Sequence, residues 1–182
     1  MPVTLVGANV QGKPNYITIA HVGIIDFSRL PPSMGKTHYT HLCLSMGKTH
    51  YTNEGIKENG TFSVNIPSTR LEKETDYCGL VSGRKADKGA LFTTFFGKLE
   101  TAPMIMECPL NMECRLVNTV DMQKHDVFIG EVVETYCNEE YLVDGAVDFS
   151  RIDPIIFTMY DPFSFNLGEL SPGPGTQEEN KN

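Results

Sequence analysis

Tryptophan is absent from this chain of 182 residues, and so is any stretch of about 20 consecutive apolar residues that could span a bilayer. No apolar run follows a basic segment near the N-terminus, so we expect neither a signal peptide nor a membrane span, and a cytoplasmic location. Basic side chains are scarce, with 15 Lys and Arg against 23 Asp and Glu and a net charge of −8. This balance argues against nucleic acid or an anionic membrane as the main partner, although it is compatible with a local anion site.

Several motifs that identify common enzyme classes are missing as well. Gly-Lys-Thr occurs twice, but a nucleoside-triphosphate loop needs a glycine five residues before the Gly-Lys pair, where this chain has Leu30 and Leu42. There is no Gly-x-Gly-x-x-Gly for a dinucleotide and no Gly-x-Ser-x-Gly for a serine hydrolase. No histidines or cysteines have the spacing of a metal site, so we expect none.

The five cysteines are odd in number and form no Cys-x-x-Cys pair. We expect all five to be reduced and mostly buried, rather than joined in disulfides. For Cys43 we favour a core position over a redox role.

The chain has the length and the apolar content, 40%, of one globular domain, which we place at residues 1–170. Residues 171–182 are rich in Pro, Gly and acidic side chains and predict a flexible tail. Short β-like runs separated by turns, mostly in hairpin order, predict a mainly β barrel with two short helices over its ends. Strands are expected at 2–10, 16–25, 41–44, 61–66, 103–109, 111–119, 127–137, 155–159 and 161–167, and helices at 53–59 and 71–82.

The second of these strands has no plainly solvated side. Tyr16 and Thr18 alternate with Ile17 and Ile19, so both faces carry side chains suited to burial or contact. A binding site or a subunit contact would account for the pattern.

The sequence SMGKTHYT occurs twice, at 33–40 and 45–52. Only the second copy leads directly into a predicted helix, which Thr52 or Asn53 is expected to cap. A helix N-terminus offers unpaired N–H groups and the positive end of the macrodipole, and Lys48 adds a full charge. Lys48, His50 and Thr52 are therefore candidates for phosphate binding, and a polar capping loop is the alternative reading of the same residues.

His125 stands beside Asp126 at a predicted strand-entry turn. A functional histidine and an ordinary exposed turn histidine are both compatible with this position.

Seven segments together form a more specific pattern than any one of them. They are Gly12-Lys13-Pro14-Asn15, Thr18-Ile19-Ala20, the second SMGKTHYT, Phe62-Ser63-Val64-Asn65-Ile66-Pro67, Asp76-Tyr77-Cys78-Gly79 with Ser82-Gly83-Arg84, Asp87-Lys88, and His125-Asp126 with Phe128-Ile129-Gly130-Glu131-Val132. In this order they resemble the flavin reductase-like family, and especially flavoredoxins and related archaeal and anaerobe FMN-binding proteins, over residues 2–165.

The resemblance implies an FMN-binding split β-barrel of Greek-key type that forms a homodimer, holds FMN near the dimer interface and transfers electrons. It implies that Lys88 or Arg84 stabilises the reduced flavin near its N1 and O2 atoms. It also implies that His125 lies near the ring or the incoming donor. The cofactor-binding residues that it implies are Thr18, Ile19 and Ala20 along the flavin, Lys48, His50, Tyr51 and Thr52 at the phosphate, and Ser82, Gly83, Arg84 and Lys88 over the cofactor.

Two departures from the family pattern are visible. Removal of residues 33–40 restores the expected spacing, so the first copy is an apparent insertion. We expect it to be a surface loop or a duplication without function, in which Lys36 and Thr40 do not bind FMN. The absence of tryptophan leaves any aromatic contact with the flavin to other side chains. The available ones are Tyr16, Tyr51, Tyr77 and Phe163.

The sequence thus favours a dimeric FMN flavoprotein, either a flavoredoxin that works between redox proteins or a reductase that uses NADH or NADPH. A non-enzymatic FMN-binding or storage protein of the same fold is the alternative, and a pyridoxamine-phosphate-type oxidase is a more distant one. We expect Lys48→Ala to weaken FMN binding and Lys36→Ala to leave it unchanged.

Overall fold

The computed structural model describes residues 2–29 and 37–157, and for residues 27–29 and 37–40 it describes the backbone alone. The chain is mainly β, with three short helices among the described residues. The strands are β1 (Thr4–Val10), β2 (Lys13–Ile19), β3 (Val22–Arg29), β4 (Thr37–Gly47), β5 (Thr61–Ile66), β6 (Thr94–Phe95), β7 (Met104–Ile105), β8 (Leu110–Asp121), β9 (His125–Cys137), β10 (Leu142–Val143) and β11 (Ala146–Val147), and the helices are α1 (Tyr51–Asn59), α2 (Glu72–Leu80) and α3 (Phe149–Ile152).

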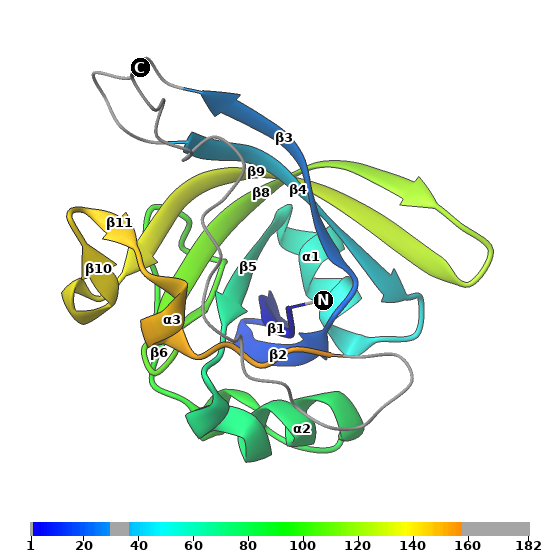
Figure 1. The fold of residues 1–182 in the computed structure, drawn as a ribbon. Helices are drawn as coiled ribbons and strands as arrows, with labels where there is room; N and C mark the ends of the chain where they lie inside the picture. Colours follow the sequence, from blue (N-terminus) through cyan, green and yellow to red (C-terminus); the bar gives the residue numbers. More distant parts are fainter. Residues whose placement is uncertain (1, 30–36, 158–182) are drawn as a thin grey trace, which may run out of the picture.

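One antiparallel sheet of seven strands organises the fold, in the order β2-β1-β5-β8-β9-β4-β3. It curves around α1, while α2 lies beyond β2 (Figure 1). The hairpins β1–β2, β3–β4 and β8–β9 are local, whereas β5 joins β1 to β8 and β9 joins β8 to β4. The predicted barrel does not close. Strand β3 begins only two residues after β2 but pairs with β4 instead, so β2 and β3 are the two edges of the sheet.

The first hairpin is tighter than predicted. Its turn consists of Gln11 and Gly12, with φ of 51° and 77°, the positive pair typical of a two-residue hairpin turn. Residues 13–15, which we assigned to the turn, belong to β2. The predicted strand 16–25 is in fact two strands, separated at Ala20 and His21.

Two apolar clusters explain why β2 has no solvated side. Ile17 and Ile19 belong to the main core between the sheet and α1, together with Ile56 and Phe62. Tyr16 points to the opposite side, into a second cluster. Its ring meets that of Phe92 edge-on at 5.3 Å, and Leu5, Cys78, Ile105 and Cys108 complete the cluster. The protein itself therefore covers both faces of β2.

Strand β4 absorbs parts of both SMGKTHYT copies. The last four residues of the first copy begin the strand, and Ser45–Gly47 of the second copy end it, so the predicted loop 45–52 is shorter than expected. Lys36 lies outside the described residues, and Thr40 belongs to a strand rather than to the expected surface loop. Strand β3 also runs to Arg29, through the break that we placed at Asp26, where the pairing register shifts instead.

The β8–β9 hairpin is confirmed and is longer than predicted. His125 and Asp126 are the first residues of β9 rather than part of a turn. The predicted strand at 103–109 shrinks to β7, whereas β6 was not predicted. Of the predicted strand at 155–159, the described part shows a single bridge at Ile156. The segment 161–167 and the tail 171–182 lie outside the described residues.

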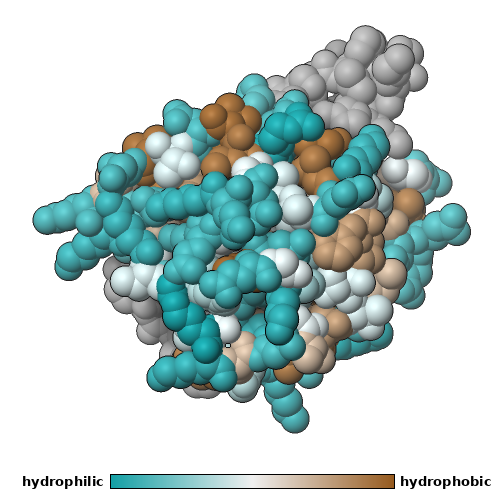
Figure 2. All heavy atoms as spheres, turned by 180° about the vertical axis from the view of Figure 1, so that it is seen from behind, coloured by the Kyte–Doolittle hydropathy of each residue, from teal (hydrophilic) through white to brown (hydrophobic). Residues whose placement is uncertain are grey.

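Both predicted helices form. Helix α1 ends at Gly60 as expected, but His50, not Thr52 or Asn53, is its N-cap residue. Asn53 instead donates from Nδ2 to the carbonyl oxygen of Gly47 at 3.0 Å. In the described part of the chain, no helix has the length and apolarity needed to cross a membrane. The face seen in Figure 2 is mostly hydrophilic, with separate apolar groups.

All five cysteines are free, as expected, and Cys78, Cys108 and Cys114 are buried. Cys43 and Cys137 are only partly buried. Cys43 lies on β4, opposite Gly23 of β3.

Candidate functional site

A cavity of about 230 Å³ lies at the N-terminus of α1. It is bounded by the turn between β4 and α1, by the last residues of α2, and by the loop that follows α2. Three sequence-distant segments that carry predicted site residues therefore meet here. The lining residues are Ile17, Thr49, His50, Tyr51, Thr52, Cys78, Gly79, Leu80, Val81, Ser82, Gly83 and Lys88.

His50 is the N-cap residue of α1. Its side chain makes no capping hydrogen bond, and its ring is so close to Gly47 that a Cβ atom there would lie 3.4 Å from Cε1. The Nδ1 atom is buried and has no hydrogen-bond partner among the described residues. Burial lowers the pKa of His50, and the charges of His125 and Lys88 lower it further.

Lys88 is the buried cation of the cavity, with 3% of its surface exposed. Its Nζ atom donates to the carbonyl oxygen of Cys78 at 2.9 Å, and the structure shows no carboxylate paired with it in the described ranges. Burial lowers the pKa of this ammonium group. A lysine is rarely buried without a counter-ion, so Lys88 suits an anionic ligand.

Asn15 ties β2 to the start of α1. Its Nδ2 donates to Thr52 Oγ1 at 2.7 Å, and both side chains are buried. The loop after α2 passes so close that a Cβ atom on Gly83 would lie 1.9 Å from Asn15 Oδ1 and 2.9 Å from Tyr51 Cδ1. Gly83 therefore allows the backbone approach that forms this wall of the cavity.

Arg84 connects the loop after α2 to the start of α1. Its guanidinium group lies over the ring of Tyr51, 4.8 Å from the centroid. It donates to the carbonyl oxygen of Thr49 at 3.3 Å and pairs with Glu54. Because the Arg84–Glu54 pair is exposed, we expect it to position the loop more than to stabilise the fold.

Lys48 does not line the cavity. Its Nζ atom pairs with Asp121 at the end of β8, and its backbone N–H donates to the carbonyl oxygen of Lys124 at 3.2 Å. The ammonium group lowers the pKa of the Asp121 carboxyl. Phosphate binding by Lys48 stays a prediction. In this structure the ammonium group of Lys48 pairs with the carboxylate of Asp121.

Of the remaining predicted residues, Ser82 lines the cavity, whereas Thr18, Ile19, Ala20 and His125 are not among its lining residues. Thr18 donates from Oγ1 to the carbonyl oxygen of Thr75 in α2, and Ile19 is in the main core. Ala20 is at the bend between β2 and β3. His125 lies opposite Gly47 in the pairing of β4 with β9, and it is close enough to His50 to lower the pKa of that residue. Ser82 accepts the backbone N–H of Arg84 at 3.3 Å.

The sequence analysis missed several lining or supporting residues. Ile17 was placed on a strand face suited to burial or contact, Cys78 was expected to be buried, and the last residues of α2 were expected to lie within a helix ending at 82. Asn15 was assigned to a turn. Only the adjacency of Asn15 to the strand 16–25 could have suggested a buried role, because its partner Thr52 is 37 residues away.

The cavity residues fit a phosphate-bearing ligand. The uncapped N-terminus of α1, the buried ammonium group of Lys88 and the ring of His50 all border this cavity. Ile17 supplies an apolar wall, and Leu80, 78% exposed, extends it outward. Ligand cavities usually measure about 300–1,000 Å³, so this one is suited to the phosphate end of a ligand rather than to a whole cofactor.

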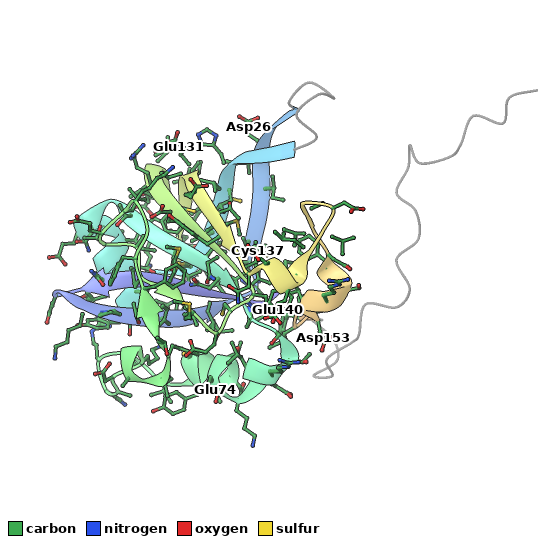
Figure 3. All side chains as sticks on the ribbon, turned by 90° about the vertical axis from the view of Figure 1, so that its left-hand side faces the viewer. Asp26, Glu74, Glu131, Cys137, Glu140 and Asp153 are labelled. Carbon is green, nitrogen blue, oxygen red and sulfur yellow. The ribbon has the colours of Figure 1, made fainter. Side chains whose placement is uncertain are left out.

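A second cavity, of about 350 Å³, lies elsewhere and contains no predicted site residue. Figure 3 labels Cys137 at its edge, at the end of β9, well apart from Glu74 on α2. Since this cavity contains no charged side chain, it offers less to an anionic cofactor. Its lining residues are Phe95, Met106, Asn111, Thr135, Tyr136, Cys137 and Asn138.

Comparisons with known proteins agree with the fold. The family model "Flavin reductase like domain" matches residues 1–152. The crystal structure of a flavoredoxin from Methanosarcina acetivorans is 43% identical, with a TM-score of 0.87, over 97% of this chain and 90% of that one. A flavoredoxin of Desulfovibrio vulgaris (Miyazaki F) is 29% identical, with a TM-score of 0.83, over 97% and 91% of the two chains.

A protein with a split barrel domain from Shewanella frigidimarina is 17% identical over 95% of this chain and 85% of its own, with a TM-score of 0.77. At this identity the likeness concerns the fold alone. The expected split-barrel class is therefore confirmed, in a form whose sheet is open in this chain.

Proposed function

Because this chain belongs to the flavin reductase-like family, we propose that it binds FMN and transfers electrons as a flavoredoxin does. The 43% identity to a flavoredoxin over nearly the whole chain supports this role. One structural observation carries the proposal: the buried Lys88 faces a cavity at the N-terminus of α1 with no carboxylate partner among the described residues. The proposal includes a cytoplasmic location.

The phosphate monoester of FMN is the group that this cavity would receive. Such a group carries about −1.5 to −2 charges near pH 7. Lys88 provides a full positive charge, His50 a ring nitrogen, and the first turn of α1 its N–H groups. These residues would fix the phosphate, and Arg84 would hold the covering loop in place through Tyr51 and Thr49.

When bound, the flavin supplies the redox chemistry, taking up and releasing electrons singly or in pairs. The chain's own part is to orient the ring and to exclude water beside Ile17 and Leu80. A positive charge near N1 and O2 would favour the reduced anion. Lys88 and Arg84 are both candidates for this role, and Lys88 is the more buried of the two.

A homodimer is part of the proposal. Apolar side chains of β3 and β8 are exposed, among them Ile24 (55%) and Val117 (56%). A second copy of the chain would cover such surfaces. Sedimentation equilibrium should give twice the chain mass of 20.2 kDa, and a single-chain mass would contradict this part of the proposal.

The experiment that tests the function begins with FMN-reconstituted protein under anaerobic conditions. Retention of flavin absorbance through gel filtration is expected, and its loss would contradict FMN binding. Bleaching within seconds of adding NADH or NADPH would indicate a reductase. Without bleaching, chemically reduced protein should pass electrons to a redox protein such as a ferredoxin if it is a carrier, whereas a storage protein should not.

A further inference from the structure

The cavity at the start of α1 gathers positive charge around His50. Lys88 approaches from the loop after α2, His125 from β9, and the helix contributes the positive end of its dipole. Each of these disfavours a second proton on the imidazole. In the absence of an anion His50 is therefore neutral near pH 7, with a lowered pKa.

The neighbouring acidic groups already have partners. From β8, Asp121 pairs with Lys48. From α1, Glu54 pairs with Arg84.

On β9, the buried Asp126 accepts from Lys57 at 2.8 Å. From α2, the thiol of Cys78 has its pKa raised to about 11 and is uncharged. Within the described residues, the ring of His50 thus has Lys88 and His125 as basic neighbours and no free carboxylate.

The position of its ring allows His50 to respond to a ligand in the cavity. It lies against Gly47 and borders the cavity, and its buried Nδ1 atom lacks a hydrogen-bond partner in the described part of the chain. A protonated imidazole has a donor at both nitrogens. An anion entering the cavity would bring beside the ring a charge opposite to that of Lys88.

We propose that His50 takes up a proton when the flavin phosphate enters this cavity, so that cofactor binding and protonation of the α1 N-cap are coupled. The inference rests on the proposed function. The anion supplies a counter-charge to the proton, beside a ring whose acidic neighbours among the described residues are already paired. Lys88 anchors the phosphate as a fixed charge, and His50 adds a charge that exists only in the bound state.

The sign of the pH effect follows from linkage. Because the bound state holds more protons, affinity falls as the pH rises through the bound-state pKa of His50, by at most about tenfold per pH unit. The phosphate of FMN titrates near pH 6 and acts in the opposite direction, so measurements at pH 7 and above isolate the protein's contribution.

Calorimetric titration of the FMN-free protein in two buffers of different ionisation enthalpy counts the protons. FMN binding at pH 7.0 should take up about half a proton or more, and clearly less at pH 8.5. Riboflavin, which lacks the phosphate, should cause little uptake at either pH. His50→Gln keeps an amide donor at the site and should abolish the uptake while retaining measurable FMN binding.

Equal uptake in His50→Gln would assign the proton to another group, such as Lys88, and overturn the inference. So would zero uptake in the wild type. The histidine ring signals of the wild-type protein, followed by NMR between pH 5.5 and 8.5 with and without FMN, give the same answer without a variant, because the pKa of His50 should rise on binding. FMN binding with a pH-independent affinity would sink only this inference, whereas no binding at any pH would sink the proposed function as well.

Discussion

The Nζ atom of Lys88 donates a hydrogen bond of 2.9 Å to the carbonyl oxygen of Cys78, and both residues line the cavity at the start of α1. The bond ties the loop after α2 to the C-terminal half of that helix. An ammonium group has three donors, so this bond leaves capacity for a ligand. Lys88 thereby orders the wall of the cavity and presents a charge inside it.

Replacement of Lys88 should weaken FMN binding while leaving the stability of the fold nearly unchanged. Lys88→Met removes one charge-assisted contact and should weaken FMN binding by about 1.5–3 kcal/mol, or roughly 10- to 150-fold. Thermal unfolding of the FMN-free protein should change little, because the variant also removes a buried charge. Lys85→Met, an exposed lysine of the same loop, serves as the control and should bind FMN normally. Equal affinities of the two variants would refute the role of Lys88.

The two copies of the octapeptide give a second comparison. Lys48→Ala should weaken FMN binding less than Lys88→Met does, because Lys48 is exposed and pairs with Asp121. Lys36→Ala in the first copy should leave binding unchanged. Flavin fluorescence titration measures all three. A loss in Lys36→Ala as large as that in Lys48→Ala would contradict the assignment of the second copy to the site.

Gly83→Ala tests the close approach between the covering loop and the floor of the cavity. The added Cβ atom would lie 1.9 Å from Asn15 Oδ1, so either the loop or Asn15 must move. We expect a loss of FMN affinity of about tenfold or more. Gly79→Ala, in the same wall, would bring its Cβ no closer than 3.3 Å to Thr18 and is the matched control. Similar affinities of both variants would show that this contact does not shape the site.

The pH dependence of folding offers a test of His50 without ligand. Because its folded-state pKa is lowered below the ordinary value of about 6.5, the unfolded chain binds more protons between these two values. The stability of the FMN-free protein should therefore fall as the pH drops below about 7 through that window. Urea unfolding between pH 5 and 8 should show a shallower decline for His50→Gln, whereas His21→Gln, an exposed histidine, should follow the wild type. A decline unchanged in His50→Gln would contradict the lowered pKa.

Local signals predicted much of the secondary structure. The turn residues around Gly12, the alternating run that became β9, and the stop at Gly60 depend on near neighbours, and each was recognisable. The end of β2 was missed, because no turn residue marks the bend at Ala20 and His21. The open edges of the sheet were missed as a consequence. Without that bend, β2 and β3 were read as one strand, whereas β3 in fact pairs with β4 at the opposite edge from β2.

The sequence by itself determined that this protein is mainly β and that the second octapeptide precedes a helix N-terminus. Patterns with periods of two and 3.6 residues and the flanking turn residues are enough for that. Only the tertiary structure decided which charges face the cavity. It turned Lys48 outward to Asp121, buried Lys88 against Cys78 and, within the described residues, left the Nδ1 atom of His50 without a hydrogen-bond partner. These outcomes depend on contacts between segments 10 to 73 residues apart, and burial and counter-ions, which set a group's charge, exist only after those segments have packed.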